Sequence, residues 1–149
     1  MTVPFRQLHH VCIVVRDIDS AMAYYETLGI GPWEQYPPLT GYSDLEVPNA
    51  DAFLKMKYRF VNLDNVQIQL CEPPQEDCPQ RRFLDEKGEG VFHIGFESPL
   101  DDGVEQAEAR GLQVIMRGRR SNGTGFAYFD TLEDAGVVLM IRQSTPSAS

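Results

Sequence analysis

The sequence predicts an α+β fold in which two copies of one module, each a strand, a helix and three further strands, pack around a central cavity. The first observation is a repeated order of segments, because residues 8–73 and residues 91–143 pass through strand-like and helix-like patterns in the same succession. Such self-similarity indicates a duplicated unit. With 149 residues and 42% hydrophobic side chains, the chain can bury one core. We therefore expect a single domain over residues 1–149, with residues 144–149 as a flexible tail.

The second observation is a pair of histidines at matching positions. His10 lies in the first strand of one copy and His93 in the first strand of the other. In each copy a glycine, Gly29 or Gly111, ends the helix that follows. Equivalent strands of a duplicated fold present equivalent faces, so we expect the two imidazoles to face one cavity.

The first copy begins with LHHVCIVVRDIDSAMAYYETLGI, which predicts a strand, a turn and an amphipathic helix. A polar connection containing PWEQYPP follows. The alternating runs KMKYRFVNL and NVQIQLCEP, separated by a turn, predict a hairpin. The loop of residues 38–53 is long and turn-rich. We expect it to shelter the cavity and to be more mobile than the strands.

The second copy repeats this order. GVFHIGFES predicts a strand, PLDDGVEQAEARGL a helix, and QVIMRGR, GTGFAYFDT and AGVVLMIRQ three further strands. The closing strands of the two copies also match, and their alignment places Met140 at the position that corresponds to Gln69.

The composition limits the partners of the chain. A net charge of −9 argues against nucleic acid or an anionic membrane, because both favour a basic protein surface. No apolar run approaches the roughly 20 residues of a membrane span, and the opening MTVPFRQ lacks the apolar region of a secretory signal. Three cysteines at unrelated spacings favour free thiols in a reducing compartment. We expect a cytoplasmic protein that acts on or binds a small molecule.

The sequence resembles the vicinal oxygen chelate superfamily, which includes glyoxalases, extradiol dioxygenases, fosfomycin-resistance enzymes and methylmalonyl-CoA epimerases. LHHVCIVVRDIDSAMAYY, VFHIGFES and FAYFDTLEDAGVVLMI are similar to the module openings and the closing hairpin of the epimerase-like branch. The resemblance covers residues 8–143. It implies paired βαβββ modules that form an incomplete barrel around a divalent metal, and pairing of two chains into a homodimer.

The resemblance also implies the metal ligands: a histidine that opens each module, a glutamine or glutamate four residues before a proline, and a glutamate in the last strand. His10, Gln69 and His93 match, and Met140 stands at the glutamate position. Imidazole suits Zn, Co, Ni, Fe or Mn. A thioether is a soft ligand, so we expect Met140 to form cavity wall without binding the ion. The alternative for each histidine is a hydrogen-bonded core residue, and for Gln69 a polar wall residue.

Five further residues complete the candidate site. Glu97, on the same strand face as the second histidine, and Tyr128 are candidate catalytic residues. Lys57 and Arg59 occupy the strand in which the epimerase-like branch carries an acid/base glutamate, and they would bind an anionic group if their strand face points inward. A solvated face is the alternative. Trp33 is a candidate for the cavity wall.

The predicted function is that of a metal-dependent isomerase, epimerase or lyase that acts next to the carbonyl of a small anionic substrate, a carboxylate or an acyl thioester. The ion would act as a Lewis acid. Three neutral ligands leave the ion its full charge, which favours an anionic substrate. The alternative is a metal-free protein that sequesters small molecules between the modules, with Trp33, Tyr36 and Met140 as wall. Iron-dependent ring cleavage is disfavoured, because that branch relies on a carboxylate ligand.

Overall fold

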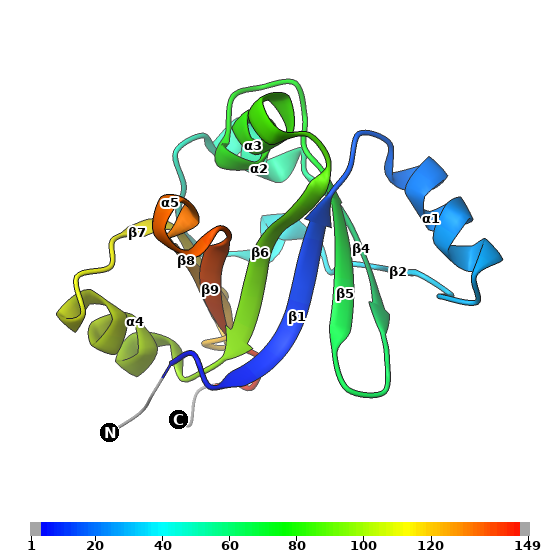
Figure 1. The fold of residues 1–149 in the computed structure, drawn as a ribbon. Helices are drawn as coiled ribbons and strands as arrows, with labels where there is room; N and C mark the ends of the chain where they lie inside the picture. The colour runs from blue at the N-terminus through cyan, green and yellow to red at the C-terminus, as the bar shows by residue number, and fades with distance from the viewer. Residues whose placement is uncertain (1–3, 147–149) are drawn as a thin grey trace.

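A computed structural model describes residues 4–146. Its strands form one mixed sheet in the order β2-β4-β5-β1-β6-β9-β8-β7-β3, which curls around a cavity without closing into a barrel (Figure 1). The α+β fold of two βαβββ modules predicted from the sequence is confirmed. The first module consists of β1 (Gln7–Val14), α1 (Ile18–Thr27), β2 (Glu34–Gln35), β4 (Lys57–Asn62) and β5 (Gln67–Glu72). The second consists of β6 (Gly90–Glu97), α4 (Leu100–Ala109), β7 (Val114–Arg119), β8 (Gly125–Phe129) and β9 (Val138–Gln143).

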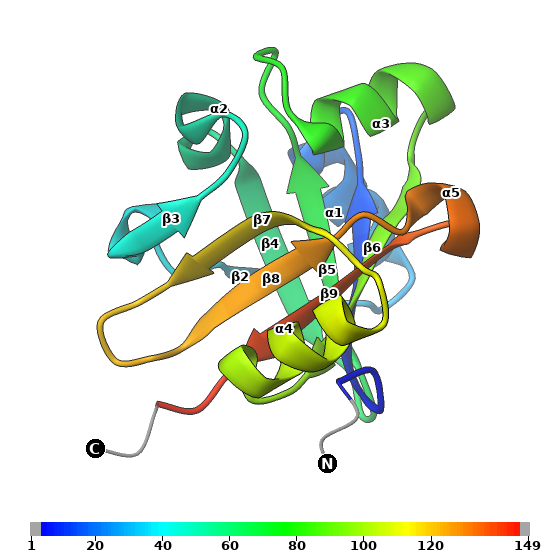
Figure 2. The ribbon, with the colours of Figure 1, turned by 90° about the vertical axis from the view of Figure 1, so that its left-hand side faces the viewer.

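The remaining elements lie in the connections. They are the 3₁₀ turn η1 (Leu39–Gly41), β3 (Asp44–Glu46), α2 (Ala50–Leu54), α3 (Pro79–Lys87) and α5 (Leu132–Ala135). Helices α1 and α4 flank the sheet on opposite sides, and α2 and α3 lie across one end of it (Figures 1 and 2). No helix among residues 4–146 is long and apolar enough to cross a membrane.

Local sequence explains where the module helices begin and end. The Asp17 side chain caps α1 by accepting a hydrogen bond of 3.0 Å from the backbone N–H of Ser20. Beyond the last turns of α1 and α4, Gly29 and Gly111 adopt φ values of +83° and +91°. Only glycine adopts such values without strain, so both helices end at the predicted glycines.

The two modules join through their first strands. β1 and β6 pair antiparallel and place His10 opposite Gly95 and Cys12 opposite His93. On the outer sides, β1 pairs parallel with β5 and β6 pairs parallel with β9, so the arrangement repeats in both modules. This pairing brings both histidines to the middle of the sheet.

Three apolar clusters hold the sheet and helices together. The largest lies on the concave side and is made of residues from both modules: Cys12, Val14, Ala52, Phe53, Met56, Cys71, Cys78, Phe83, Leu84, Phe92, Met116, Phe126, Tyr128, Val138 and Met140. A second cluster packs α4 against β8 and β9, and a third lies beneath α1. Apolar packing from both modules therefore fills much of the concave side of the curled sheet.

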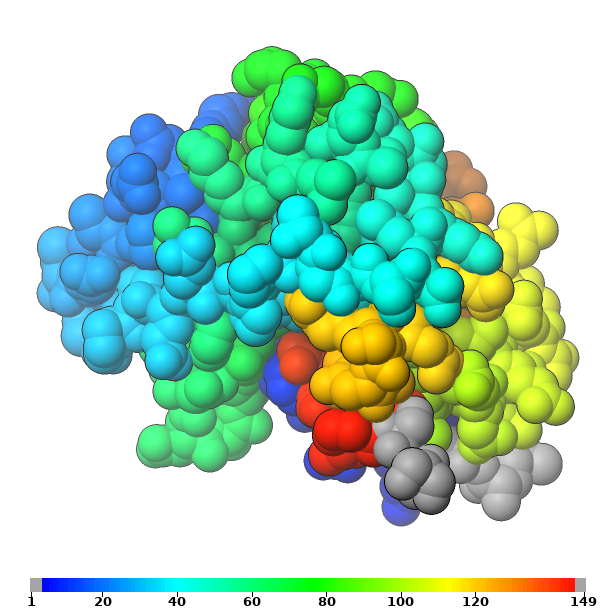
Figure 3. Space-filling model, turned by 180° about the vertical axis from the view of Figure 1, so that it is seen from behind, coloured from blue at the N-terminus to red at the C-terminus, as the bar shows by residue number. Residues whose placement is uncertain are grey.

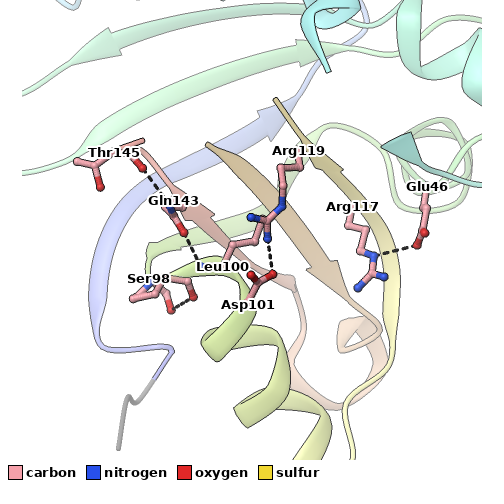
Figure 4. A network of polar contacts seen from close by, with 9 residues as sticks. Glu46, Ser98, Leu100, Asp101, Arg117, Arg119, Gln143 and Thr145 are labelled. Carbon is pink, nitrogen blue, oxygen red and sulfur yellow. Dashed lines mark hydrogen bonds and ion pairs between the residues drawn. The ribbon is translucent and has the colours of Figure 1, made fainter. Parts of the chain in front are cut away.

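The segment of residues 38–53, predicted as a loop, contains short regular elements: η1, β3 and most of α2. β3 pairs antiparallel with β7 at the far edge of the sheet, so this segment of the first module completes the edge of the second. The Arg117 guanidinium donates a hydrogen bond of 2.8 Å to the Glu46 carboxylate across this pairing, and Arg119 contacts Asp101 of α4 (Figure 4). The residues from 36 to 53, called the strap below, thus cross over the open side of the sheet.

The predicted tail lies partly outside the described residues, since nothing beyond residue 146 is described. At its start, Ser144 donates hydrogen bonds to the Glu97 carboxylate through its backbone N–H and its hydroxyl. The neighbouring Gln143 side chain accepts a hydrogen bond of 2.8 Å from the backbone N–H of Leu100 and donates one of 3.0 Å to the Thr145 carbonyl (Figure 4). The first residues of the tail are therefore held against β6 and α4.

Candidate functional site

The concave face of the sheet encloses a cavity of about 440 Å³ between the two modules. It opens between the β4–β5 hairpin and the β7–β8 turn. Figure 3 shows this opening as a hollow below the cyan strap, between the green hairpin and the yellow-orange turn. Its size lies within the range of sites for small organic molecules. The lining consists of Tyr36, Pro37, Leu39, Tyr42, Phe53, Met56, Tyr58, Phe60, Gln67, Gln69, Gln80, Met116, Arg120, Asn122, Thr124, Gly125, Phe126, Tyr128, Met140, Arg142, Gln143 and Ser144.

The charge of this lining is opposite to that of the chain as a whole. The described residues that line the cavity include Arg120 and Arg142 and no aspartate or glutamate, although the chain carries a net charge of −9. Seven of the described lining residues are tyrosine or phenylalanine, and three of these seven, Tyr36, Tyr42 and Phe53, belong to the strap. The described lining therefore combines positive charge with a largely aromatic and apolar wall.

The strap closes one side of the cavity with Leu39, Tyr42 and Phe53. It is fastened by Arg120, whose Nη2 donates a hydrogen bond of 3.1 Å to the Pro38 carbonyl. The guanidinium also lies 4.1 Å from the centre of the Tyr42 ring, within the range of a cation–π contact. The strap therefore lies against the cavity as the sequence predicted. Its greater mobility stays a prediction.

The two predicted histidines meet in the centre of the sheet. The Nε2 atoms of His10 and His93 lie 3.0 Å apart, and both side chains are fully buried. Gly95 makes this possible, because a Cβ atom there would lie 2.1 Å from His10 Cε1. Burial lowers the pKa of His93 to about 3 and holds the pKa of His10 well below its usual value, with a smaller contribution from His93. Both imidazoles are therefore neutral at physiological pH and carry a nitrogen lone pair.

The imidazole pair lies behind the cavity wall rather than on its surface. Neither histidine is among the lining residues, whereas Gln69, Met140 and Tyr128 are. The Tyr128 ring packs edge-on against His93 with 4.8 Å between ring centroids. Strand pairing places Gln69 next to Cys12 on one side. In the second module, Met140 pairs with Gly95, the residue opposite His10. Gln69 and Met140 thus occupy related positions on the cavity side of the pair.

The donor atoms of His10, His93 and Gln69 suit a divalent cation, but no anionic ligand is among them. The His10 and His93 Nε2 atoms lie within hydrogen-bond distance of each other, as the alternative interpretation of the two histidines expects. Their separation of 3.0 Å also equals that of two nitrogens that bind one octahedral ion at about 2.1 Å and at a right angle. The Gln69 side chain is 3% exposed. Its amide Nε2 donates a hydrogen bond of 2.8 Å to Oε1 of Gln67. Among residues 4–146, no cluster of three or more histidine, cysteine, aspartate or glutamate side chains is suited to a metal. The set is therefore neutral and lacks an anionic ligand.

His9 contributes a contact that the sequence did not indicate. Its Nδ1 lies 2.9 Å from the Nδ1 of His10, although its position in the strand directs it to the opposite face. If His10 is to present a lone pair at Nε2, its proton must sit on Nδ1, and His9 Nδ1 is then the acceptor. Histidine ligands of metals are commonly oriented by such a partner. His9 is thus placed to fix the tautomer of His10.

Comparison with known proteins identifies the family. The sequence matches the profile of the Glyoxalase/Bleomycin resistance protein/Dioxygenase superfamily over residues 9–128. The chain belongs to this superfamily. It is 27% identical over 136 residues to the uncharacterized protein YqjC of Bacillus subtilis (strain 168), with 89% of each chain covered.

Solved structures show the same fold. Methylmalonyl-CoA epimerase from Mycobacterium tuberculosis aligns with a TM-score of 0.70 at 22% identity, covering 98% of this chain and 93% of that one. A Streptomyces coelicolor methylmalonyl-CoA epimerase variant in complex with 2-nitronate-propionyl-CoA aligns with a TM-score of 0.69 at 21% identity, covering 95% and 98%. The resemblance to the epimerase-like branch of the superfamily is therefore confirmed for the fold.

Lys57 and Arg59, which the sequence suggested as a clamp for an anion, are not among the cavity-lining residues. The side chains of β4 that line the cavity are those of Tyr58 and Phe60, so alternation along the strand directs the two cations outward. Lys57 forms an ion pair of 3.4 Å with Glu72. The cations that do reach the cavity are Arg120 and Arg142, neither of which was singled out for that role from the sequence. We therefore leave Lys57 and Arg59 out of the proposed site.

Trp33 also lies away from the cavity. Its ring packs 5.4 Å from that of Tyr25 in α1, centre to centre, within the apolar cluster beneath that helix. The neighbouring Tyr36 and Pro37 line the cavity instead. Trp33 precedes the strap, and its size suits a cavity wall. Its side chain instead fills the space between α1 and the sheet.

Glu97 lies outside the cavity lining, and its carboxylate is already hydrogen-bonded. It accepts the two hydrogen bonds from Ser144 and is not among the lining residues. Tyr128, in contrast, lines the cavity and lies against His93. Burial raises the pKa of Tyr128 and of its neighbour Tyr58 well above the usual value, so both stay protonated phenols at neutral pH. Of the two catalytic candidates, only Tyr128 is placed to reach a ligand in the cavity.

Replacing His9 by alanine is expected to weaken zinc binding by about tenfold, because His10 loses the acceptor that fixes its tautomer. Isothermal titration of the metal-free protein with zinc measures this. His9→Gln keeps an acceptor oxygen and is the matched control, which should retain most of the affinity. Equal affinities for all three proteins would remove His9 from the site.

Replacing Arg120 by methionine is expected to loosen the strap, because both the bond to the Pro38 carbonyl and the charge over Tyr42 are lost. Amide hydrogen exchange of residues 38–45 should accelerate by about tenfold or more. Arg117→Met is the control, since it removes only the exposed ion pair to Glu46, which is worth little. Unchanged exchange in the Arg120 variant would show that the strap is held by its apolar contacts alone.

Proposed function

We propose that this member of the superfamily is a divalent-metal-dependent isomerase, epimerase or lyase that acts next to the carbonyl of a small anionic substrate. The observation that carries the proposal is the pair of neutral, buried imidazoles of His10 and His93, whose Nε2 atoms face each other at 3.0 Å behind the wall of the cavity. A carboxylate or an acyl thioester is the substrate class that we favour. In support, one similar fold is that of an epimerase in complex with an acyl-CoA analogue.

The residues proposed to hold the ion are His10, His93 and Gln69. When bound there, a divalent ion supplies Lewis acidity, which stabilises negative charge on an oxygen of the substrate. The chain itself adds no negative charge to this set, since Met140 occupies the place of the glutamate that the family resemblance implies. A neutral ligand set holds an ion less tightly and leaves more of its charge for the substrate.

Arg120 and Arg142 supply the attraction for the anionic group of the substrate. Both line the cavity, and no described carboxylate competes with the substrate there. The aromatic wall excludes water from the bound molecule, which strengthens each polar contact inside. Binding is thus expected to weaken as salt is added, because the steering charges lie near the opening.

Tyr128 is the residue of the chain that we propose for the chemical step. Its phenol stays protonated and lies against His93, so it can donate a hydrogen bond to an oxygen that gains negative charge. Tyr58 is hydrogen-bonded to it and also lines the cavity. The two phenols form a polar contact within an otherwise apolar wall.

One observation favours a second candidate, a metal-free protein that sequesters small molecules. The described lining contains no carboxylate that could act as a general base, and it is mostly aromatic and apolar. Such a cavity binds an aromatic anion without converting it. The two candidates share the cavity and differ in metal content and in turnover.

Proton exchange separates the two candidates. The protein, loaded in turn with zinc, cobalt, nickel and manganese, is incubated in deuterium oxide with methylmalonyl-CoA and with small carboxylates that carry a carbonyl. The proposed enzyme should exchange the proton next to the carbonyl only when metal is present. Stoichiometric ligand binding without exchange, under all metals, would favour the sequestering protein.

Cytoplasmic location and a homodimer are further proposals. The three cysteines, Cys12, Cys71 and Cys78, are free and buried, which supports a reducing compartment. Sedimentation analysis of the purified chain tests the dimer.

A further inference from the structure

Gln80 is a buried polar side chain whose hydrogen-bonding groups have no partner. It lies in the first turn of α3, between the two modules, and only 1% of its surface is exposed. Both its Oε1 and its Nε2 lack a hydrogen-bond partner in the described chain. Its side chain nevertheless lines the cavity. Both atoms have almost no accessible surface, so the amide lies directly behind the cavity wall, and a ligand reaches its acceptor and donor groups only when the side chain turns toward the cavity.

The residues around Gln80 that also line the cavity leave its amide without a partner, although Asn49 lines the small pocket behind it. A small pocket of about 10 Å³ adjoins the cavity at this point, and both share Phe53, Met56 and Met116 with Gln80 as lining. These neighbours are apolar side chains and cannot satisfy an amide. A buried donor or acceptor left unpaired is strongly unfavourable, so native structures rarely contain one.

Gln80 also marks one end of the cavity. Helices α2 and α3 cover that end of the sheet, whereas the β4–β5 turn, near the opening, lies at the other end (Figure 1). Three polar lining residues belong to other elements: Asn122 and Thr124 to the β7–β8 turn beside the opening, and Arg142 to the last part of β9. A ligand that enters with its anionic group toward the arginines would place its other end next to Gln80.

We infer that the ligand of this cavity carries an amide edge, an N–H adjacent to a carbonyl, at its inner end, and that Gln80 recognises it. A carboxamide, a lactam or an imide presents such an edge. It accepts from Nε2 and donates to Oε1 of Gln80 in one cyclic pair of hydrogen bonds, so both orphaned groups are satisfied. A carboxylate would accept from Nε2 and leave Oε1 without a donor. The inference rests on the cavity of the proposed function and is independent of the metal.

Three probes of similar shape test the inference on the wild-type protein, in the presence of a chelator. They are hydrocinnamamide, its methyl ketone analogue benzylacetone, and hydrocinnamate. Calorimetry should give an affinity for the amide about tenfold or more above that for the ketone, because the ketone leaves Oε1 unpaired. Equal affinities, a preference for the carboxylate at low and high salt alike, or no binding of the amide would each overturn the inference.

A variant ties the preference to Gln80. Gln80→Met keeps the length of the side chain and removes its polar atoms, so the ratio of amide to ketone affinity should fall to about one. The same variant should raise the melting temperature of the ligand-free protein by about 3 to 8 °C, because an unsatisfied amide is no longer buried. Gln113→Met, at an exposed position of the second module, makes the same chemical change and should alter neither quantity.

The outcomes separate this inference from the proposed function. An unchanged amide preference in Gln80→Met, or a melting temperature at or below that of the wild type, shows that Gln80 is satisfied within the free protein and overturns the inference. Metal binding at His10 and His93 is judged by its own titration and does not enter this test. If Gln80→Met does not fold, the three-probe comparison on the wild-type protein decides.

Discussion

Replacing Met140 by glutamate is expected to tighten the binding of divalent metal by about tenfold to a hundredfold. The side chain is 5% exposed and lines the cavity next to the imidazole pair, at the position that corresponds to Gln69. A carboxylate there would give the neutral set its first anionic ligand. An added charge–charge attraction of a few kcal/mol at an effective dielectric of about 20 is partly offset by the cost of burying the carboxylate.

The same variant carries a second expected effect. Without metal, a buried carboxylate has no partner, so Met140→Glu should melt at a lower temperature than the wild type, and added metal should restore stability. Capture of an anionic ligand should weaken, because part of the positive charge is cancelled. Met140→Gln, which is neutral, is the control and should change metal affinity much less. Equal metal affinities for wild type, glutamate and glutamine variants would contradict the placement of Met140 beside a metal.

Removing either imidazole is expected to have the largest effect. His10→Ala and His93→Ala should each lower metal affinity by more than about a hundredfold, because loss of even an outer partner of a metal ligand costs about 10- to 100-fold. Zinc titration by calorimetry, with far-UV circular dichroism to verify folding, measures this.

Cys12→Ala is the matched control for the imidazole variants. Cys12 is fully buried and pairs with His93 across the central strands, so its replacement also removes volume from the same part of the core. Its metal affinity should stay that of the wild type. If the cysteine variant loses affinity to the same degree as the histidine variants, the loss reflects packing and the imidazoles are not ligands.

The duplicated order of segments was sufficient to predict the architecture. Strand alternation and the helix-ending glycines are local signals, and each copy supported the interpretation of the other. The pairing of β3 with β7 was not predictable in this way, because it joins segments far apart in the sequence. Helix α3, which carries Gln80, belongs to neither copy, so the repeat gave no information about it.

The repeat predicted which strand side chains lie near the cavity, and it gave no such information for the residues outside it. His10, His93 and Met140 lie in strands whose faces are fixed by the duplication. Lys57 and Arg59 were candidates only on the condition that their face of β4 points inward, and the structure fulfils the alternative, an outward face. Their alternation with Tyr58 and Phe60 already indicates which face is apolar.

The positions of Arg120 and Trp33 depend on tertiary packing, which the sequence pattern does not reveal. Arg120 reaches the cavity from the β7–β8 turn, through contacts with the strap that depend on how the sheet curls. Trp33 could have faced either the cavity or α1, and only the packing of the helix on the sheet decides. Neither position follows from periodicity.

The most direct test of the proposed metal site is the metal content of the wild-type protein. The purified chain is stripped with a chelator, dialysed against equal concentrations of zinc, cobalt, nickel and manganese, and analysed for each element. We expect close to one divalent ion per chain in the wild type and none in His93→Ala. Substoichiometric metal in the wild type, or the same content in both proteins, would contradict the proposed metal site.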